Sequence, residues 1–181
     1  MAKIVKFHEK GGPEVLTLEE VTLLSVAEND VRFRVHAIGL NRAESMYRKG
    51  AHLQDYTWPS RVGYEASDVV EAIGKNVTGF APGDAVSVVP RNIRMATYGT
   101  YGEVADMPAN CLARNSDGFC TQMQRRHGFS TGRPTSVSSK LPIKSGVLKP
   151  VIAKTFPLAQ IVESHRYLES NEQIGKIVVT V

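Results

Sequence analysis

Short alternating segments, separated by Gly- and Pro-rich turns, dominate the first hundred or so residues of this 181-residue chain. Val31–His36 alternates most strictly, with apolar side chains on one face and basic side chains on the other, which is typical of a strand. Gly11–Gly12–Pro13 has the composition of a turn between two strands. Further strands are predicted at residues 1–6, 15–20, 67–73 and 84–89. Many short strands joined by such turns favour a mainly β fold, a barrel or a sandwich.

Two helices are expected beside these strands. The first is Asn41–Lys49, where Asn41 can cap the helix and Gly50 can end it. Pro157 opens the second, whose apolar stripe carries His165. On such a stripe a packed structural histidine is favoured over a catalytic one. Residues 150–155 and 176–181, on either side of this helix, are predicted strands.

Residues 120–144 have a different composition from the rest of the chain. They are rich in Ser, Thr, Arg and Gln, contain five basic residues and no Asp or Glu, and have almost no apolar periodicity. The chain's net charge of +4 therefore resides in this one segment. No helix-turn-helix or RNA-recognition pattern surrounds it, so we expect a solvated basic loop and no nucleic-acid partner.

Composition excludes other classes of protein. No apolar run approaches the roughly 20 residues that a membrane-spanning helix needs, so no membrane partner is expected. The N-terminus lacks the apolar stretch of a signal peptide. The two cysteines, Cys111 and Cys120, give no disulfide framework and cannot alone hold zinc. We expect a cytoplasmic protein.

Several ordered motifs resemble the quinone-oxidoreductase branch of the medium-chain, zinc-type alcohol dehydrogenase superfamily. In the first part of the chain they are Gly11–Leu16, Gly39–Arg42, Gly63–Ala66 and Gly83–Val86. Near the end they are Leu148–Ala153, His165–Glu169 and Gly175–Val179. Each motif is weak alone, whereas the ordered set is specific. The resemblance implies a GroES-like β-barrel at residues 1–119, completed by a C-terminal helix and strand at 145–181.

The same resemblance implies that a dinucleotide-binding Rossmann domain is missing. In the family this domain stands between the two parts of the barrel, where the present chain has only residues 120–144. No Gly-x-Gly-x-x-Gly turn follows a predicted strand and opens a helix, so the pyrophosphate of a nicotinamide cofactor lacks its usual anchor. We expect no cofactor and no NAD(P)H-dependent reductase activity.

Three residues match positions that border the substrate cleft in quinone reductases: Asn41, Tyr47 and Tyr64. Asn41 and Tyr64 also stand where the zinc-dependent branch has zinc ligands, so no metal is expected. Alternatively, Asn41 is a helix cap and Tyr47 and Tyr64 are packed aromatic residues. The sequence does not decide between these structural roles and a substrate cleft.

A frameshift in the gene can explain the unusual composition of residues 120–144. Residues 121–136 can be back-translated into a DNA sequence with permitted codons. When the reading frame of that DNA is moved by two nucleotides, it encodes ADAAATWIQYGTAY. This peptide resembles the family's helix that enters the Rossmann domain. We infer a frameshift followed by a deletion that restores the frame near Lys144. A gene sequence incompatible with the second frame would exclude this origin.

Gly128–Gly132 matches Gly-x-Ser-x-Gly, the nucleophile-elbow pattern of ester hydrolases, with Ser130 at its centre and His127 just before it. Hydrolysis of small carboxylic esters by Ser130 is the leading positive hypothesis, with His127 or His165 as base and Asp117 orienting it. Coincidence is the competing interpretation, because this pattern is short and common.

Two further hypotheses stay open. One is an inactive folded remnant that self-associates through the apolar surface that loss of a Rossmann domain exposes. The other is a small-molecule binding module that takes a quinone at the half-site around Asn41, Tyr47 and Tyr64.

Overall fold

The computed structural model describes residues 1–91, 93–115 and 151–181. Asp117 and the predicted bridge at 120–144, which contains His127 and Ser130, lie outside the described residues. The strands are β1 (Ala2–Phe7), β2 (Thr17–Val21), β3 (Asp30–Arg34), β4 (Ala37–Gly39), β5 (Ser60–Arg61), β6 (Ala66–Ile73), β7 (Ala85–Val88), β8 (Val104–Pro108), β9 (Leu112–Arg114), β10 (Ile152–Pro157) and β11 (Lys176–Thr180). The helices are α1 (Arg42–Lys49), α2 (Met95–Tyr98) and α5 (Ile161–Ser170), with short 3-10 turns η1 (Pro13–Val15), η2 (Ala109–Cys111) and η3 (Leu158–Gln160).

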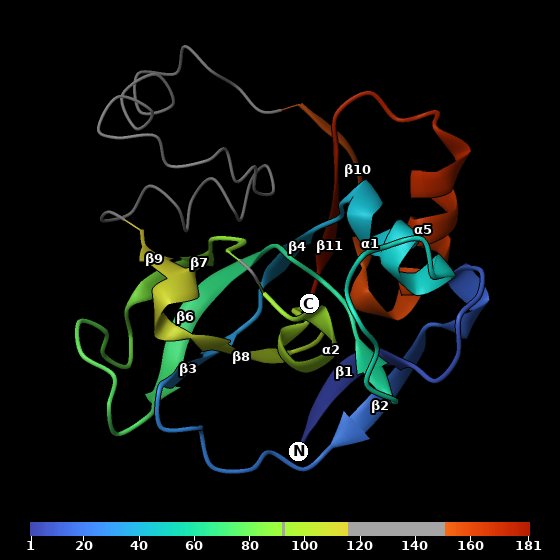
Figure 1. Ribbon diagram of the computed structural model, residues 1–181. Coiled ribbons are helices and arrows are strands. Elements are labelled where there is room, and N and C mark those ends of the chain that lie inside the picture. The colour runs from blue at the N-terminus through green and yellow to red at the C-terminus, as the bar shows by residue number, and fades with distance from the viewer. Residues whose placement is uncertain (92, 116–150) are drawn as a thin grey trace.

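The described strands form two sheets. A small sheet has the order β2-β1-β5. A larger, curled sheet has the order β10-β11-β4-β6-β3-β8, and β7 pairs with β6 and β9. Its pairs are antiparallel except for β10 with β11. The prediction of a mainly β fold is confirmed (Figure 1).

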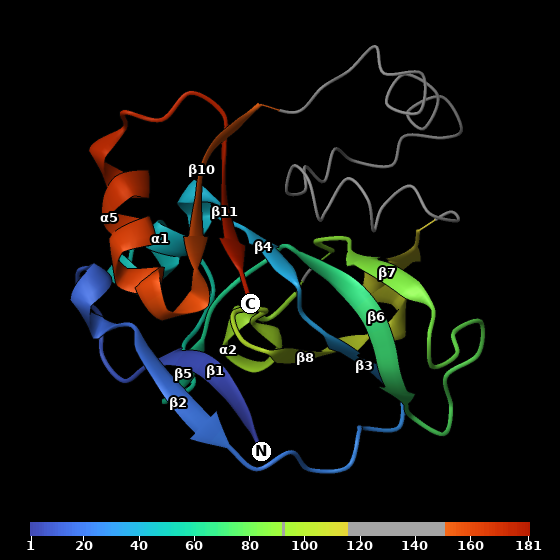
Figure 2. The same ribbon diagram turned by 180° about the vertical axis from the view of Figure 1, so that it is seen from behind.

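The C-terminal elements complete the larger sheet, as predicted. β11 pairs with β4, joining Val179 to Ile38 across more than half of the chain. α5 lies beside α1 in both views (Figures 1 and 2). The second helix was predicted to open at Pro157, but the structure places η3 first and begins α5 at Ile161.

The core lies between the sheets and under the two longer helices. α5 buries Ile161, Ser164, His165 and Leu168 on one face, which matches the predicted stripe at most positions. The fully buried side chains of Phe7, Phe33, Ile38, Met107 and Val179 come from strands of both sheets. β8 buries alternate residues, whereas β4 and β11 each bury three residues in a row.

No helix in the described ranges is long and apolar enough to cross a membrane.

Candidate functional site

The site begins at the first turn of α1, where Asn41 occupies the N-cap as predicted. Its backbone N–H donates to the Glu44 carboxylate at 2.7 Å, the backward half of a capping box. The Asn41 side chain is fixed separately: its Nδ2 donates to the Gly39 carbonyl and its Oδ1 accepts from Lys176 Nζ at 2.8 Å. Lys176 also pairs with Glu65 at 2.8 Å. Asn41 thus joins the β4–α1 corner to β11.

Tyr47 lies in the core and not at a surface. Its side chain is fully buried and its hydroxyl lies 2.8 Å from the Ser60 hydroxyl. Its ring stacks on Tyr56 with centroids 4.7 Å apart, and Tyr56 stacks on Trp58 at 5.1 Å. The packed-aromatic interpretation therefore fits Tyr47. It anchors an aromatic stack, Tyr47–Tyr56–Trp58, that ends at a half-exposed tryptophan.

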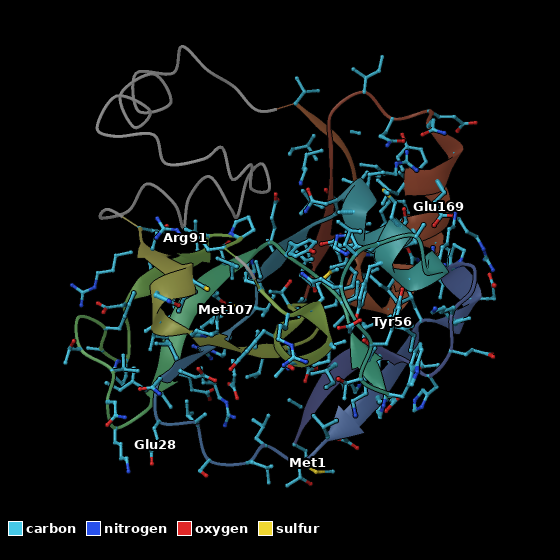
Figure 3. The ribbon with its side chains drawn as sticks, viewed as in Figure 1. Met1, Glu28, Tyr56, Arg91, Met107 and Glu169 are labelled. Atoms are coloured by element: carbon cyan, nitrogen blue, oxygen red, sulfur yellow. The ribbon has the colours of Figure 1, made fainter. Side chains whose placement is uncertain are left out.

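Figure 3 labels Tyr56, the middle ring of this stack, on the side of α1 nearest β1. Phe7 of β1 meets all three rings edge-on, at centroid distances of 5.6–6.3 Å. Lys10 lies over the Tyr56 ring, 4.7 Å from its centroid. The stack is therefore held on one side by the small sheet.

Tyr64 is only partly buried, and its hydroxyl belongs to a polar cluster. Gln54 Nε2 donates to the Tyr64 oxygen at 3.3 Å, and His52 Nε2 lies 3.3 Å from the same oxygen. The Gln54 side chain is itself fixed by the Ile93 carbonyl and the Met95 N–H. His52 meets the Tyr47 ring edge-on at 5.8 Å. This cluster, His52–Gln54–Tyr64, lies against the aromatic stack.

Burial raises the pKa of Tyr64 to about 12, and the nearby charges of Glu44 and Tyr47 act in the same direction. Tyr64 is therefore a neutral phenol at physiological pH and can donate its proton in a hydrogen bond. Its position is fixed by its backbone, because the Tyr64 N–H donates to Glu44 Oε1 at 2.8 Å. Gly63, before it, has a φ of 119°, which favours glycine.

The Glu44 carboxyl group connects the residues of the site through hydrogen bonds. It is fully buried and accepts hydrogen bonds from the backbone of Asn41, the backbone of Tyr64 and the Tyr101 hydroxyl at 2.5 Å. Burial raises the pKa of Glu44 to about 7, although these three donors oppose the shift. One carboxyl group thus fixes both Asn41 and Tyr64.

His165 continues this network from α5. It is fully buried, and its Nε2 lies 3.2 Å from the Tyr101 hydroxyl, which is already directed at Glu44. Its Nδ1 has no hydrogen-bond partner in the part of the chain that the structure describes. Burial lowers the pKa of His165 to about 3, and the charges of Arg48 and Lys49 add to the effect. This is the environment of a packed structural histidine.

The structure thus brings Asn41 and Tyr64 together through Glu44 and places Tyr47 beneath them. It adds residues that the sequence interpretation missed, Glu44, His52, Gln54, Tyr101 and Lys176. The Asn41-x-x-Glu44 spacing is the one pattern that pointed to any of them, since a glutamate three residues after a cap is typical of a capping box.

The residues present do not fit a zinc ion. In residues 1–91, 93–115 and 151–181, no three His, Cys, Asp or Glu side chains gather as a metal site. Asn41 Oδ1 is held by the cationic Lys176, which disfavours a metal ion beside it.

Comparison with known proteins identifies the family. The family model described as zinc-binding dehydrogenase matches residues 51–179. The chain belongs to this family. A quinone oxidoreductase from Pseudomonas aeruginosa is 35% identical over 119 residues, which cover 66% of this chain and 35% of that protein. The chain therefore spans about a third of the length of that relative.

Solved structures agree with this assignment. The quinone oxidoreductase of Pseudomonas syringae pv. Tomato DC3000 is 29% identical, with a TM-score of 0.55 over 91% of this chain and 48% of that one. An NAD-dependent alcohol dehydrogenase shares the fold, with a TM-score of 0.77 at 18% identity over 99% of each chain. The chain is a quinone-oxidoreductase-like member of the zinc-binding dehydrogenase family, and its GroES-like fold is confirmed.

Proposed function

We propose that this chain binds a quinone, or a similar flat carbonyl compound, beside Tyr64, and that it does not itself carry out NAD(P)H-dependent reduction. The observation that carries the proposal is the partly open His52–Gln54–Tyr64 cluster lying against the aromatic stack Tyr47–Tyr56–Trp58. The names of its relatives, quinone oxidoreductases, point to the same class of compound.

The chemistry of the cluster suits such a ligand. A quinone has two carbonyl oxygens that accept hydrogen bonds and a flat ring that packs on aromatic side chains. Gln54 Nε2 and His52 Nε2 are both directed at the Tyr64 oxygen, so the neutral Tyr64 phenol can donate its own proton to a carbonyl oxygen of the ligand. The adjoining rings supply apolar and aromatic surface. Glu44 holds the Tyr64 backbone in place, so the donor is positioned before the ligand arrives.

Reduction of the quinone needs a bound hydride donor held close to it. In residues 1–91, 93–115 and 151–181 no Gly-x-Gly-x-x-Gly sequence occurs, so the described residues offer no such turn for a pyrophosphate. Binding without reduction is therefore the proposed function.

Ester hydrolysis by Ser130 stays a prediction. Ser130, His127 and Asp117 lie outside the described residues, and the remaining candidate base, His165, is buried against Tyr101. No described contact favours the hydrolase over the binding module. Saturable p-nitrophenyl acetate turnover that is lost in Ser130→Ala would establish it. Self-association and a cytoplasmic location also stay predictions.

Replacing Tyr64 with phenylalanine is expected to weaken duroquinone binding about threefold to tenfold, because one neutral hydrogen bond is lost while the ring remains. Duroquinone is suitable because its four methyl groups block addition of thiols. The chain's single tryptophan, Trp58, ends the aromatic stack, so quenching of its fluorescence reports binding. Thermal shift provides a second measurement.

Tyr98→Phe is the matched control, because Tyr98 is also partly buried but bonds to Asp30, away from the cluster. Durene, the same methylated ring without carbonyl groups, is the control ligand. Equal affinity for durene and duroquinone, or an unchanged affinity in Tyr64→Phe, would contradict the proposal.

A further inference from the structure

A pocket lies between the two sheets and shares no residue with the Tyr64 site. Its volume is about 180 Å³. Ile4 of β1, Val21 of β2 and Val104 of β8 give it apolar walls, and Leu23 and Leu24, from the segment that follows β2, also line it. This segment runs along the lower edge of the molecule, from β2 toward β3 (Figure 1).

The polar side of the pocket contains one complete ion pair. Arg32 of β3 bonds Asp106 of β8 through two contacts of 2.7 Å, one to each carboxylate oxygen. The remaining Arg32 donor, Nη1, reaches the Leu24 carbonyl at 2.8 Å. Both Asp106 oxygens are therefore occupied by Arg32, which also tethers the segment that follows β2.

Arg61 of β5 lies beside this pair without a carboxylate of its own. Its Nη2 donates to the Val104 carbonyl at a long 3.4 Å. Its Nε is buried and has no hydrogen-bond partner among the described residues. Burial lowers the pKa of Arg61 to about 10, with Asp106 opposing the shift and Arg32 adding to it. Even so, the guanidinium stays charged at neutral pH.

Arg61 is partly buried, and its Nε is a buried donor without a partner among the described residues, which is unfavourable unless an acceptor reaches it. The ionisable side chains that line the pocket are Arg32, Arg61 and Asp106, so the lining carries one net positive charge. One monovalent anion neutralises it. A guanidinium fork matches the two oxygens of a carboxylate, and the apolar walls suit a short hydrocarbon chain.

We propose that this pocket binds a small monocarboxylate, with its carboxylate on Arg61 and its hydrocarbon chain between Ile4, Val21 and Leu24. The site is independent of the quinone site, since none of the residues around Tyr64 lines it. A short-chain fatty acid is the simplest molecule with this combination of one negative charge and an apolar tail.

The test is calorimetric titration of the full chain with sodium butyrate at low ionic strength, with butyramide as the uncharged ligand of the same shape. We expect saturable butyrate binding and no butyramide binding. Arg61→Met keeps the length of the side chain and removes its charge, so it is expected to weaken butyrate binding by about tenfold or more, the usual effect of losing a charged hydrogen bond. Arg61→Lys keeps the charge without the forked guanidinium. Its affinity for butyrate is expected to lie between those of the original chain and Arg61→Met.

Arg166→Met is the control, because it removes the same charge from an exposed position on α5 that does not line the pocket. It is expected to bind butyrate as the original chain does. Thermal unfolding verifies that Arg61→Met is folded, since replacing a partly buried, unpaired charge with an apolar side chain is expected to leave the midpoint unchanged or higher. Butyrate affinity that is equal in the folded Arg61→Met variant, or matched by butyramide, would overturn the proposal.

Discussion

Replacing Arg48 with alanine is expected to lower the free energy of unfolding by about 3–5 kcal/mol, the usual effect of breaking a buried ion pair. Arg48 is the largest fully buried side chain of the described residues. From α1 it donates to Glu169 of α5, labelled in Figure 3, and to the Gly11 carbonyl of the N-terminal turn. Its removal leaves a cavity and separates three segments that are distant in sequence.

Two companion variants separate the causes. Arg48→Met fills most of the space without the charge, so it is expected to be less destabilising than Arg48→Ala. Lys49 pairs with the same Glu169 at 2.7 Å but is half-exposed, so Lys49→Ala is expected to change stability by about 1 kcal/mol or less. Urea unfolding followed by Trp58 fluorescence measures all three. Equal losses in Arg48→Ala and Lys49→Ala would contradict the assigned role of burial.

Local pattern was sufficient to predict most of the described elements. The alternation at Val31–His36 corresponds to β3, and the cap and terminal glycine at Asn41 and Gly50 bound α1. These features depend on neighbours in sequence, namely the period of side chains and the preferences of caps. β4, β5, β9 and the four-residue α2 were missed because they are too short to carry a period, and the five-residue β8 was missed as well.

The candidate site was predicted only in part, because its contacts are long-range. Tyr47 and Tyr64 are equivalent by resemblance, yet one is buried in a stack and the other is partly open. The Tyr101 hydroxyl reaches Glu44 across 57 residues, and among the described residues Arg61 forms no ion pair, while Asp106 is paired with Arg32. The Arg32–Asp106 pair follows from the register of β3 and β8, and the Tyr101–Glu44 contact from the packing of α1, neither of which a local pattern specifies.

The buried network of Glu44, Tyr101 and His165 is expected to give stability an unusual pH dependence. The pKa of Glu44 rises from 4.5 to about 7 in the fold. Between these values the folded chain holds a proton that the unfolded chain has lost. Raising the pH through this range therefore removes stability, in total about 3 kcal/mol.

His165 acts in the opposite direction. Its pKa falls from 6.5 to about 3 in the fold. Between these values the unfolded chain binds a proton that the folded chain excludes, so raising the pH adds stability, in total about 5 kcal/mol. From pH 4.5 to 6.5 both groups contribute to the change of the free energy of unfolding with pH, and their contributions have opposite signs. We expect them to cancel in the original chain.

Single substitutions should reveal separately how Glu44 and His165 make the free energy of unfolding depend on pH. In Glu44→Gln the His165 contribution remains, so relative to the original chain the stability should rise by roughly 1.4 kcal/mol per pH unit from 4.5 to 6.5. His165→Gln retains an amide donor toward Tyr101. In this variant the free energy of unfolding, relative to that of the original chain, should fall at a similar rate over the same pH range. Urea unfolding at pH 4.5, 5.5 and 6.5 measures both slopes, and subtraction of the original chain removes contributions from other titrating groups. Parallel stability curves for all three proteins would show that neither group changes its protonation on folding, since each variant removes one titration and otherwise keeps a side chain that can form hydrogen bonds.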